Sequence, residues 1–210
     1  MEKYIADRIV TINVDVQNDF MPGGSLAVPN GDEVIIALNE LNNFTRQNNG
    51  LVIATGDQHP IDTPHFGPDA WPPHCVQNTD GAAFDTRLNI LPTDIILDKG
   101  MGQTDGYSGF EGITREGRTL EQIMTPVGRE RVAGLIGGVA TEYCVLNTVL
   151  DATNVNPLRG NLQIYVLQDA VRGINEKDVD EAMEKMKQAG AIIVNSADVI
   201  NGEMLEITQG

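Results

Sequence analysis

The sequence predicts an α/β protein with three layers, α/β/α, around a mostly parallel sheet of roughly six strands, as in Rossmann-like folds. Two observations carry this prediction: short apolar runs rich in β-formers alternate with segments of helical spacing, and Asp or Gly follows most of the apolar runs. Such alternation favours parallel strands covered by helices on both faces. The 210 residues show no internal repeat, and we expect a single domain over residues 1–210.

The first half of the chain reads as strand, helix and strand. Residues 8–14 are rich in β-formers and stop at Asp15. We expect a helix between the turn signals at residues 30–32 and 48–50, because apolar residues recur there at helical spacing: Val34, Ile35, Leu38, Leu41 and Phe44. Residues 51–55 form a short apolar run, which predicts a buried strand.

The second half repeats this alternation. Helical spacing is clearest in residues 176–189, where one face carries Val179, Ala182, Met183 and Met186. The expected strands are residues 94–97, 132–139, 162–167 and 191–194, and the remaining expected helix is residues 141–154.

Two long irregular stretches interrupt the pattern. Residues 57–87 contain five prolines, and residues 100–117 are irregular as well. Loops of this length inside a compact domain are uncommon and usually carry function. We therefore expect these two loops to contribute to a functional site.

Four positions that matter for chemistry follow the ends of predicted strands. They are Asp15, Asp57, Lys99 and Ala140. In open parallel sheets, ligands bind beyond the carboxyl ends of the strands. We therefore expect the four positions to converge on one edge of the sheet.

The charge and cysteine content of the chain bear on its partners. Acidic residues outnumber basic ones by 30 to 14, which gives a formal net charge of -16. Such a surface repels phosphate backbones and anionic membranes, so we expect neither nucleic acid nor membrane as a partner; solubility is the simplest consequence. The first apolar stretch is short and interrupted, unlike a signal peptide or a membrane span. With only two cysteines, a cytoplasmic location is expected. A homo-oligomer is left open.

Cys144 is the candidate nucleophile. It lies in residues 137–145, where a strand is followed by a helix with Thr141 as the expected N-cap. The first turn of a helix favours a thiolate, which is the reactive form of cysteine. The alternative is a small buried hydrophobe that packs the helix on the sheet. Asp15 and Lys99 are the candidate proton acceptor and charge partner, although an Asp in a turn and a solvated Lys are each common.

The three histidines of the chain lie together. His59, His65 and His74 all fall in the proline-rich loop, and Asp57 precedes His59 in an Asp-x-His arrangement. Carboxylate and imidazole ligands suit Zn, Fe or Mn and leave positions for water or substrate. The alternative is a chance grouping in a polar loop. Cys75 directly follows His74, and adjacent residues are awkward ligands for one ion, so we expect Cys75 to be structural.

Several segments carry motifs of a known kind. These are DVQNDF at residues 15–20, PGGSL at 22–26, DQHP at 57–60, WPPHCV at 71–76, Lys-Gly at 99–100 with YSGF at 107–110, and GVATEYCV at 138–145. The first, second and last resemble isochorismatase-like cysteine hydrolases. The others are similar to the nicotinamidase/pyrazinamidase branch of that superfamily. The resemblance extends from near residue 8 to about residue 172.

The resemblance implies an amidase of NAD salvage that converts nicotinamide to nicotinate and ammonia through a thioester. It implies that Cys144 attacks the amide carbonyl, that Asp15 shuttles the proton and that Lys99 orients both. It also implies an oxyanion hole formed by the backbone N–H groups of Ala140 and Cys144, and a cis peptide between Val139 and Ala140.

The same resemblance implies one divalent metal ion, Zn, Fe or Mn, which would bind the pyridine nitrogen. The implied ligands are Asp57, His59 and His74, with His65 a further ligand in some relatives only. Phe20, Trp71 and Tyr107 are candidates for the wall of the ring site, with core packing as the alternative. Tyr143 stands where several relatives carry His, and we expect little chemical consequence from it.

Two rival functions remain open from the sequence. The first is another hydrolase of the superfamily, acting on a carbamoyl amide or an isochorismate-like substrate without needing an ion. The second is a non-enzymatic protein with a structural metal loop, which would have no need for Cys144, Asp15 and Lys99 together. Metal analysis separates the first rival from a nicotinamidase, and an ammonia-release assay separates the second.

Overall fold

The centre of the molecule is a six-stranded parallel sheet. The computed structural model describes residues 3–102, 105–155 and 160–208, and the strand order is β4-β3-β2-β5-β6-β7. The strands are β2 (Arg8–Val14), β3 (Leu51–Asp57), β4 (Ile95–Lys99), β5 (Val132–Val139), β6 (Leu162–Arg172) and β7 (Ile192–Val194). The predicted α/β fold with a parallel sheet is thereby confirmed.

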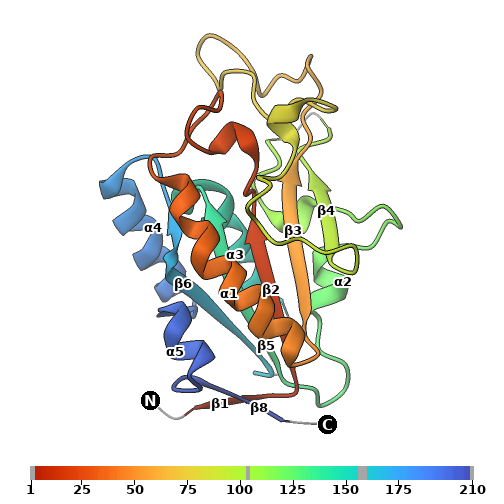
Figure 1. The fold of residues 1–210 in the computed structure, drawn as a ribbon, viewed down its shortest axis with the longest axis vertical. Helices are drawn as coiled ribbons and strands as arrows, with labels where there is room; N and C mark the ends of the chain where they lie inside the picture. Colours follow the sequence, from red (N-terminus) through yellow and green to blue (C-terminus); the bar gives the residue numbers. More distant parts are fainter. Residues whose placement is uncertain (1–2, 103–104, 156–159, 209–210) are drawn as a thin grey trace.

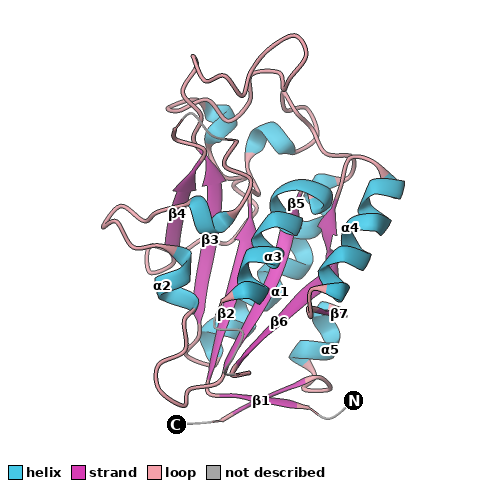
Figure 2. Ribbon diagram, turned by 180° about the vertical axis from the view of Figure 1, so that it is seen from behind, coloured by secondary structure: helices cyan, strands magenta, loops and turns pink. Residues whose placement is uncertain are grey.

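Helices cover both faces of this sheet, which gives the three layers expected from the sequence (Figure 1). One face carries α1 (Val34–Gln47) and α5 (Ser196–Ile200), and the other carries α2 (Leu120–Met124), α3 (Leu146–Asn154) and α4 (Glu176–Gln188). Figure 2 shows the strands pointing toward the end of the molecule where the long loops gather. None of the helices in the described part of the chain is long and apolar enough to cross a membrane.

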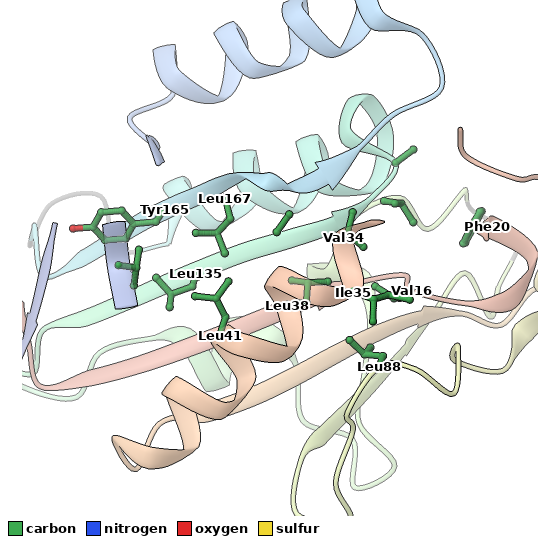
Figure 3. Close-up of a cluster of buried hydrophobic side chains, with 14 of the residues drawn as sticks. Val16, Phe20, Val34, Ile35, Leu38, Leu41, Leu88, Leu135, Tyr165 and Leu167 are labelled. Carbon is green, nitrogen blue, oxygen red and sulfur yellow. The ribbon is translucent and has the colours of Figure 1, made fainter. Parts of the chain in front are cut away.

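The core under α1 explains how the sheet is fixed in place (Figure 3). Leu38 and Leu41 of α1 are fully buried and pack in one cluster with Leu135 of β5 and Tyr165 and Leu167 of β6. All eight residues of β5 are buried, as expected for a central parallel strand whose two faces are both covered by helices. The carboxyl edge that follows β5 therefore rests on a rigid support.

Several short elements escape the sequence prediction. A separate two-stranded parallel sheet joins β1 (Tyr4–Ala6) to β8 (Leu205–Ile207), and α2 and α5 are single helical turns of five residues. Segments of three to five residues are too short to show a hydrophobic period. The structure also contains short 3₁₀ helices: η1 (Asn18–Phe20), η2 (Gly31–Glu33), η3 (Asp80–Ala82) and η4 (Gly109–Glu111).

The helix predicted over residues 141–154 is divided in two. Its first turn, η5 (Thr141–Val145), is π-helical, and α3 begins only at Leu146. The predicted N-cap, Thr141, is wrong, because Ala140 takes that position and its carbonyl accepts the N–H groups of Tyr143 and Val145 at 3.1 and 3.2 Å. The Thr141 hydroxyl has no hydrogen-bond partner among the described residues.

Candidate active site

The carboxyl ends of four neighbouring strands bring the candidate catalytic positions together. Asp15 follows β2, Asp57 ends β3, Lys99 ends β4 and Ala140 follows β5. These strands are adjacent in the order β4-β3-β2-β5, so their ends meet at one edge of the sheet. The convergence expected from the sequence is observed. The peptide between Val139 and Ala140 is cis, as the family resemblance implies.

The ammonium group of Lys99 lies at the centre of this edge. Its Nζ lies 2.8 Å from Asp15 Oδ2 and 2.6 Å from Asp57 Oδ1, and it donates to the Gly106 carbonyl at 2.8 Å. Cys144 Sγ lies 3.5 Å from the same nitrogen. Burial alone would lower the pKa of Lys99, but the Asp15 and Asp57 carboxylates raise it well above its usual value. Lys99 is therefore a buried cation.

Asp15 is held where it can exchange a proton. Its φ is +52°, in the left-handed region that few residues other than glycine adopt. Its backbone N–H donates to the Thr55 carbonyl at 3.1 Å, and the Thr55 hydroxyl donates to Oδ1 at 2.7 Å. Burial raises the pKa of Asp15 to about 6, although the Lys99 cation acts in the opposite direction. A carboxylate with that pKa can take up and release a proton near neutral pH.

Cys144 lies beside this ion pair and is only 6% exposed. The Cys144 sulfur, one carboxylate oxygen of Asp15 and one of Asp57 all lie within 4.8 Å of one another. The thiol is hydrogen-bonded to Asp15. Burial raises the pKa of the Cys144 thiol well above its usual range, and the Lys99 cation offsets this only in part. The thiolate predicted from the first helical turn stays a prediction, and Asp15 is the neighbouring group placed to take up the thiol proton.

The three imidazoles form a second cluster next to the first. One nitrogen each of His59, His65 and His74 lie within 4.8 Å of one another, and all three side chains are buried. The His59 and His65 rings stack with their centroids 4.6 Å apart. Residues from the same irregular loop thus converge without any helical spacing.

The other nitrogen of each ring is already engaged. The Nδ1 atoms lie 3.1 Å from the Gly100 carbonyl for His59, 2.7 Å from Asp105 Oδ1 for His65 and 2.8 Å from the Pro72 carbonyl for His74. These oxygens only accept, so each Nδ1 carries a hydrogen and Nε2 is the nitrogen left to face a metal ion, the arrangement typical of metal-ligating histidines. His59 Nε2 is buried and has no hydrogen-bond partner among the described residues.

The backbone of Gly100 is matched to this cluster. Its φ is +65°, and a Cβ at this position would lie 2.5 Å from the His59 ring. Only glycine lets the chain turn so closely after Lys99 while its carbonyl accepts from His59. The Lys-Gly pair singled out in the sequence thus links the ammonium group to the imidazole cluster.

Asp57 stands between the two clusters. Its Oδ1 accepts from Lys99, and its Oδ2 lies 3.7 Å from His59 Nε2. Burial alone would raise the pKa of Asp57, but the Lys99 cation and His59 lower it, so this side chain is a carboxylate. Burial also lowers the pKa of His74 to about 4, which keeps that ring neutral. Three imidazoles beside a carboxylate fit a divalent metal ion.

Cys75 belongs to neither cluster. Its N–H donates to Asp19 Oδ2 at 2.7 Å, and its thiol makes only a weak contact of 3.9 Å with the Gly81 carbonyl. Burial raises the pKa of this thiol far above its usual range. These contacts agree with the structural part expected for Cys75 from the sequence.

A pocket is lined by Cys144, His65 and His74. It takes in about 380 Å³ of space, part of which is open solvent at its mouth. Phe20, Trp71 and Tyr107, the aromatic residues selected from the sequence, all line it. The Trp71 indole Nε1–H donates to the Tyr107 hydroxyl at 2.9 Å. Asp15 and Lys99 lie beneath the pocket, with side chains that are fully buried.

Sequence reasoning did not select several residues of this wall. They are Leu26, Val28, Asp105, Tyr143 and Ile174. Tyr143, from which we expect little chemical consequence, packs its ring edge-on against Trp71 with centroids 5.0 Å apart. Its place next to Cys144 was the available signal. Ile174 lies in the loop between β6 and α4, far along the chain, and no motif marks it.

Comparisons with known proteins agree with this geometry. The model of the isochorismatase domain matches residues 10–198. The chain is 36% identical over 191 residues to the nicotinamidase/pyrazinamidase of Mycobacterium tuberculosis, covering 89% of this chain and 98% of the relative.

Two solved structures extend the comparison. The pyrazinamidase of Pyrococcus horikoshii in complex with zinc has a TM-score of 0.74 and 40% identity, over 90% of this chain and 99% of the other. The yeast nicotinamidase bound to the inhibitor nicotinaldehyde has a TM-score of 0.72 and 26% identity, over 89% and 99%.

Proposed function

Because the chain belongs to the isochorismatase family, in the branch of the nicotinamidases, we propose that it hydrolyses nicotinamide to nicotinate and ammonia. The observation that carries this proposal is the contact of Lys99 Nζ with both Asp15 Oδ2, at 2.8 Å, and Cys144 Sγ, at 3.5 Å, beneath an aromatic pocket. A nucleophile, a base and a cation within reach of one ligand atom are what amide hydrolysis requires.

The first half of the reaction forms a thioester. Asp15 takes the proton of the Cys144 thiol while the sulfur attacks the amide carbonyl carbon. The C–N bond then breaks, and Asp15 returns the proton to the leaving nitrogen, which departs as ammonia. Backbone N–H groups of Ala140 and Cys144 stabilise the oxyanion, at about 3–4 kcal/mol for each such donor.

The second half releases nicotinate. Asp15 takes a proton from a water molecule, whose oxygen attacks the thioester carbonyl. The C–S bond breaks and the proton passes to the sulfur, which restores the Cys144 thiol and the Asp15 carboxylate. Burial raises the pKa of Asp15, and the Lys99 cation limits this rise, so that the pKa is about 6. In both halves of the reaction Lys99 also offsets the negative charge that develops on the sulfur and the carboxylate.

The imidazole cluster is the proposed site of one divalent metal ion. His59, His65 and His74 would hold it through Nε2, and Asp57 would add its Oδ2. Zinc, iron and manganese suit this donor set, and the relative crystallised with zinc favours zinc. When bound, the ion supplies a Lewis acid for the lone pair of a pyridine nitrogen. Phe20, Trp71 and Tyr107 would enclose the ring.

The test is ammonia release from nicotinamide by the purified protein, before and after treatment with a chelator. Benzamide is the matched control, since it differs from nicotinamide only by a carbon in place of the ring nitrogen. We expect turnover of nicotinamide, loss of that turnover on metal removal and slow reaction of benzamide throughout. Full activity of the metal-free protein on nicotinamide would move the chain toward the metal-independent branches of the family.

Pyrazinamide is the second proposed substrate. The relative from Mycobacterium tuberculosis carries both activities in its name, and pyrazine offers a nitrogen in the same ring position as pyridine. The same ammonia assay tests it, with nicotinamide as the reference substrate. The product of the main reaction, nicotinate, would re-enter NAD synthesis.

A further inference from the structure

Glu142 links the nucleophile segment to a distant loop. It lies in η5, two residues before Cys144, and its Oε1 accepts the backbone N–H groups of Ile174 at 2.7 Å and Asn175 at 3.0 Å. Its Oε2 is buried without a hydrogen-bond partner among the described residues. The carboxylate of Glu142 thus accepts its hydrogen bonds from the loop between β6 and α4.

The loop is shaped to receive this carboxylate. A Cβ on Gly173 would lie 2.3 Å from Glu142 Oε2, so only glycine allows the backbone to approach so closely. Asn175 is the N-cap of α4, and the positive end of that helix favours an anion nearby. Hydrogen bonds to a charged acceptor are roughly twice as strong as neutral ones. Glu142 therefore fixes the position of residues 173–175.

Ile174, the residue fixed in this way, stands at the mouth of the pocket. It lines the same cavity as Cys144, yet it is 39% exposed, so its side chain separates the cavity from solvent. Tyr143, the neighbour of Glu142, lines the cavity too and packs on Trp71. A change in the position of Ile174 would therefore alter the space available around a bound ring.

We propose that Glu142 is a positioning residue that holds Ile174 at the pocket mouth, and that Ile174 thereby limits the size of the amide accepted. The inference rests on the proposed function, because it concerns discrimination among ring-substituted nicotinamides. It assigns no chemical step to Glu142, whose oxygens face a backbone loop.

The first experiment measures kcat and KM for nicotinamide, 5-methylnicotinamide and 6-methylnicotinamide by ammonia release. The variants are Glu142→Ala, Glu142→Gln and Ile174→Ala. Glu184→Ala is the control for losing an exposed glutamate, since among the described residues the Glu184 side chain accepts a hydrogen bond from the Gln188 side chain in the next turn of α4 and from no other side chain. Glutamine keeps an oxygen that can accept both N–H groups, whereas alanine does not.

We expect Glu142→Ala and Ile174→Ala to raise KM for nicotinamide by about fivefold to tenfold with kcat changed less than about twofold. Both should raise kcat/KM of a methylated amide relative to nicotinamide by about tenfold, because a wider mouth admits the extra methyl group. Glu142→Gln and Glu184→Ala should stay within about twofold of wild type.

The second experiment follows the tether itself. Hydrogen exchange, read by mass spectrometry, should show faster exchange at the Ile174 and Asn175 amides in Glu142→Ala and near wild-type protection in Glu142→Gln. If Glu142→Ala does not fold, Glu142→Asp replaces it, because a side chain shorter by one methylene cannot reach both N–H groups.

Two results would overturn the inference. One is a loss of kcat in Glu142→Ala with KM and size selectivity unchanged, which would place Glu142 in the chemistry at Cys144. The other is unchanged selectivity in Ile174→Ala. Wild-type protein that releases no ammonia from nicotinamide defeats the proposed function and this inference with it. If the wild-type protein turns over nicotinamide and the variants keep its KM and size selectivity, the proposed function stands and only the inference on Glu142 and Ile174 fails.

Discussion

Replacing Lys99 by methionine tests the buried charge cluster most directly. The substitution keeps the length of the side chain and removes a cation that contacts Asp15, Asp57 and the Gly106 carbonyl within 2.8 Å. Two carboxyl groups are then left buried close together without their common partner. We expect unfolding free energy to fall by about 3–5 kcal/mol, the usual cost of breaking a buried pair. For a chain of this length, that lowers Tm by roughly 6–20 °C.

The assay is thermal unfolding followed by circular dichroism at pH 8 and pH 5. The loss should be smaller at pH 5, because one of the two carboxyl groups can then stay protonated and uncharged. The matched control is Lys177→Met. Lys177 lies on α4 with its side chain 83% exposed and an ion pair to Glu181 at 3.6 Å, so its loss should cost less than about 0.5 kcal/mol.

The double variant with Asp15→Asn decides whether the groups act as one unit. Removing Asp15 as well as Lys99 leaves only Asp57 charged, so the combined loss of stability and of kcat should be far less than the sum of the two single losses. Independent, additive losses in this cycle would refute the reasoning, as would a Lys99→Met variant as stable as the Lys177→Met control.

Three further predictions follow from the site. Cys144→Ala should abolish turnover with Tm nearly unchanged, while Cys75→Ser should keep substantial activity because Cys75 has no proton partner near the pocket. Ammonia release and thermal unfolding are measured for both variants. If the two outcomes were exchanged, Cys144 would not be the nucleophile. His59→Ala and His74→Ala should lose bound metal and most nicotinamidase activity, and His65→Ala should lose less of both if His65 is an optional ligand. The metal content of each purified variant is measured by mass spectrometry. An unaltered metal content in all three variants would rule out the imidazole cluster as the metal site. Because Asp15 must be a carboxylate to take the thiol proton and burial raises its pKa to about 6, kcat/KM should fall as pH drops through that value; pH profiles with metal content verified at each point test this, and a flat profile down to pH 4 would contradict it.

The parts of the fold that the sequence predicts well are those with long apolar runs. Strands β2 and β5 occupy the expected residues, because strands buried on two faces are rich in β-forming apolar residues over almost their whole length. By contrast, β6 runs five residues further than expected, through Gln168 and Asp169, which read as a turn. A register shift opposite Ile136 and Gly138 lets these polar residues continue the strand. Hydrophobic pattern alone carries no sign of such an irregularity.

Some residues of the site can likewise be predicted from the sequence, and others cannot. Asp15, Asp57 and Lys99 were found because a rule about strand ends ties sequence position to a place in space. The burial of Cys144, which raises the pKa of its thiol, leaves no sign in the local sequence pattern. Glu142, Asp105 and Ile174 meet their partners only through the packing of separate loops, with separations of 32 and 40 residues for Glu142–Ile174 and His65–Asp105. No local spacing encodes contacts of that kind.

The small sheet of β1 and β8 has a practical consequence for handling the protein. It brings the two described ends of the chain together at the end of the molecule opposite the long loops (Figure 1), and those loops supply residues of the pocket. If the protein is attached to a solid surface through a linker at either end, the pocket mouth should therefore face away from that surface. A fluorescent reporter attached at either end would likewise lie far from the pocket mouth. Because both ends share one pair of strands, a bulky attachment that strips β1 would also release β8, so a sensor built this way needs a flexible spacer before residue 4.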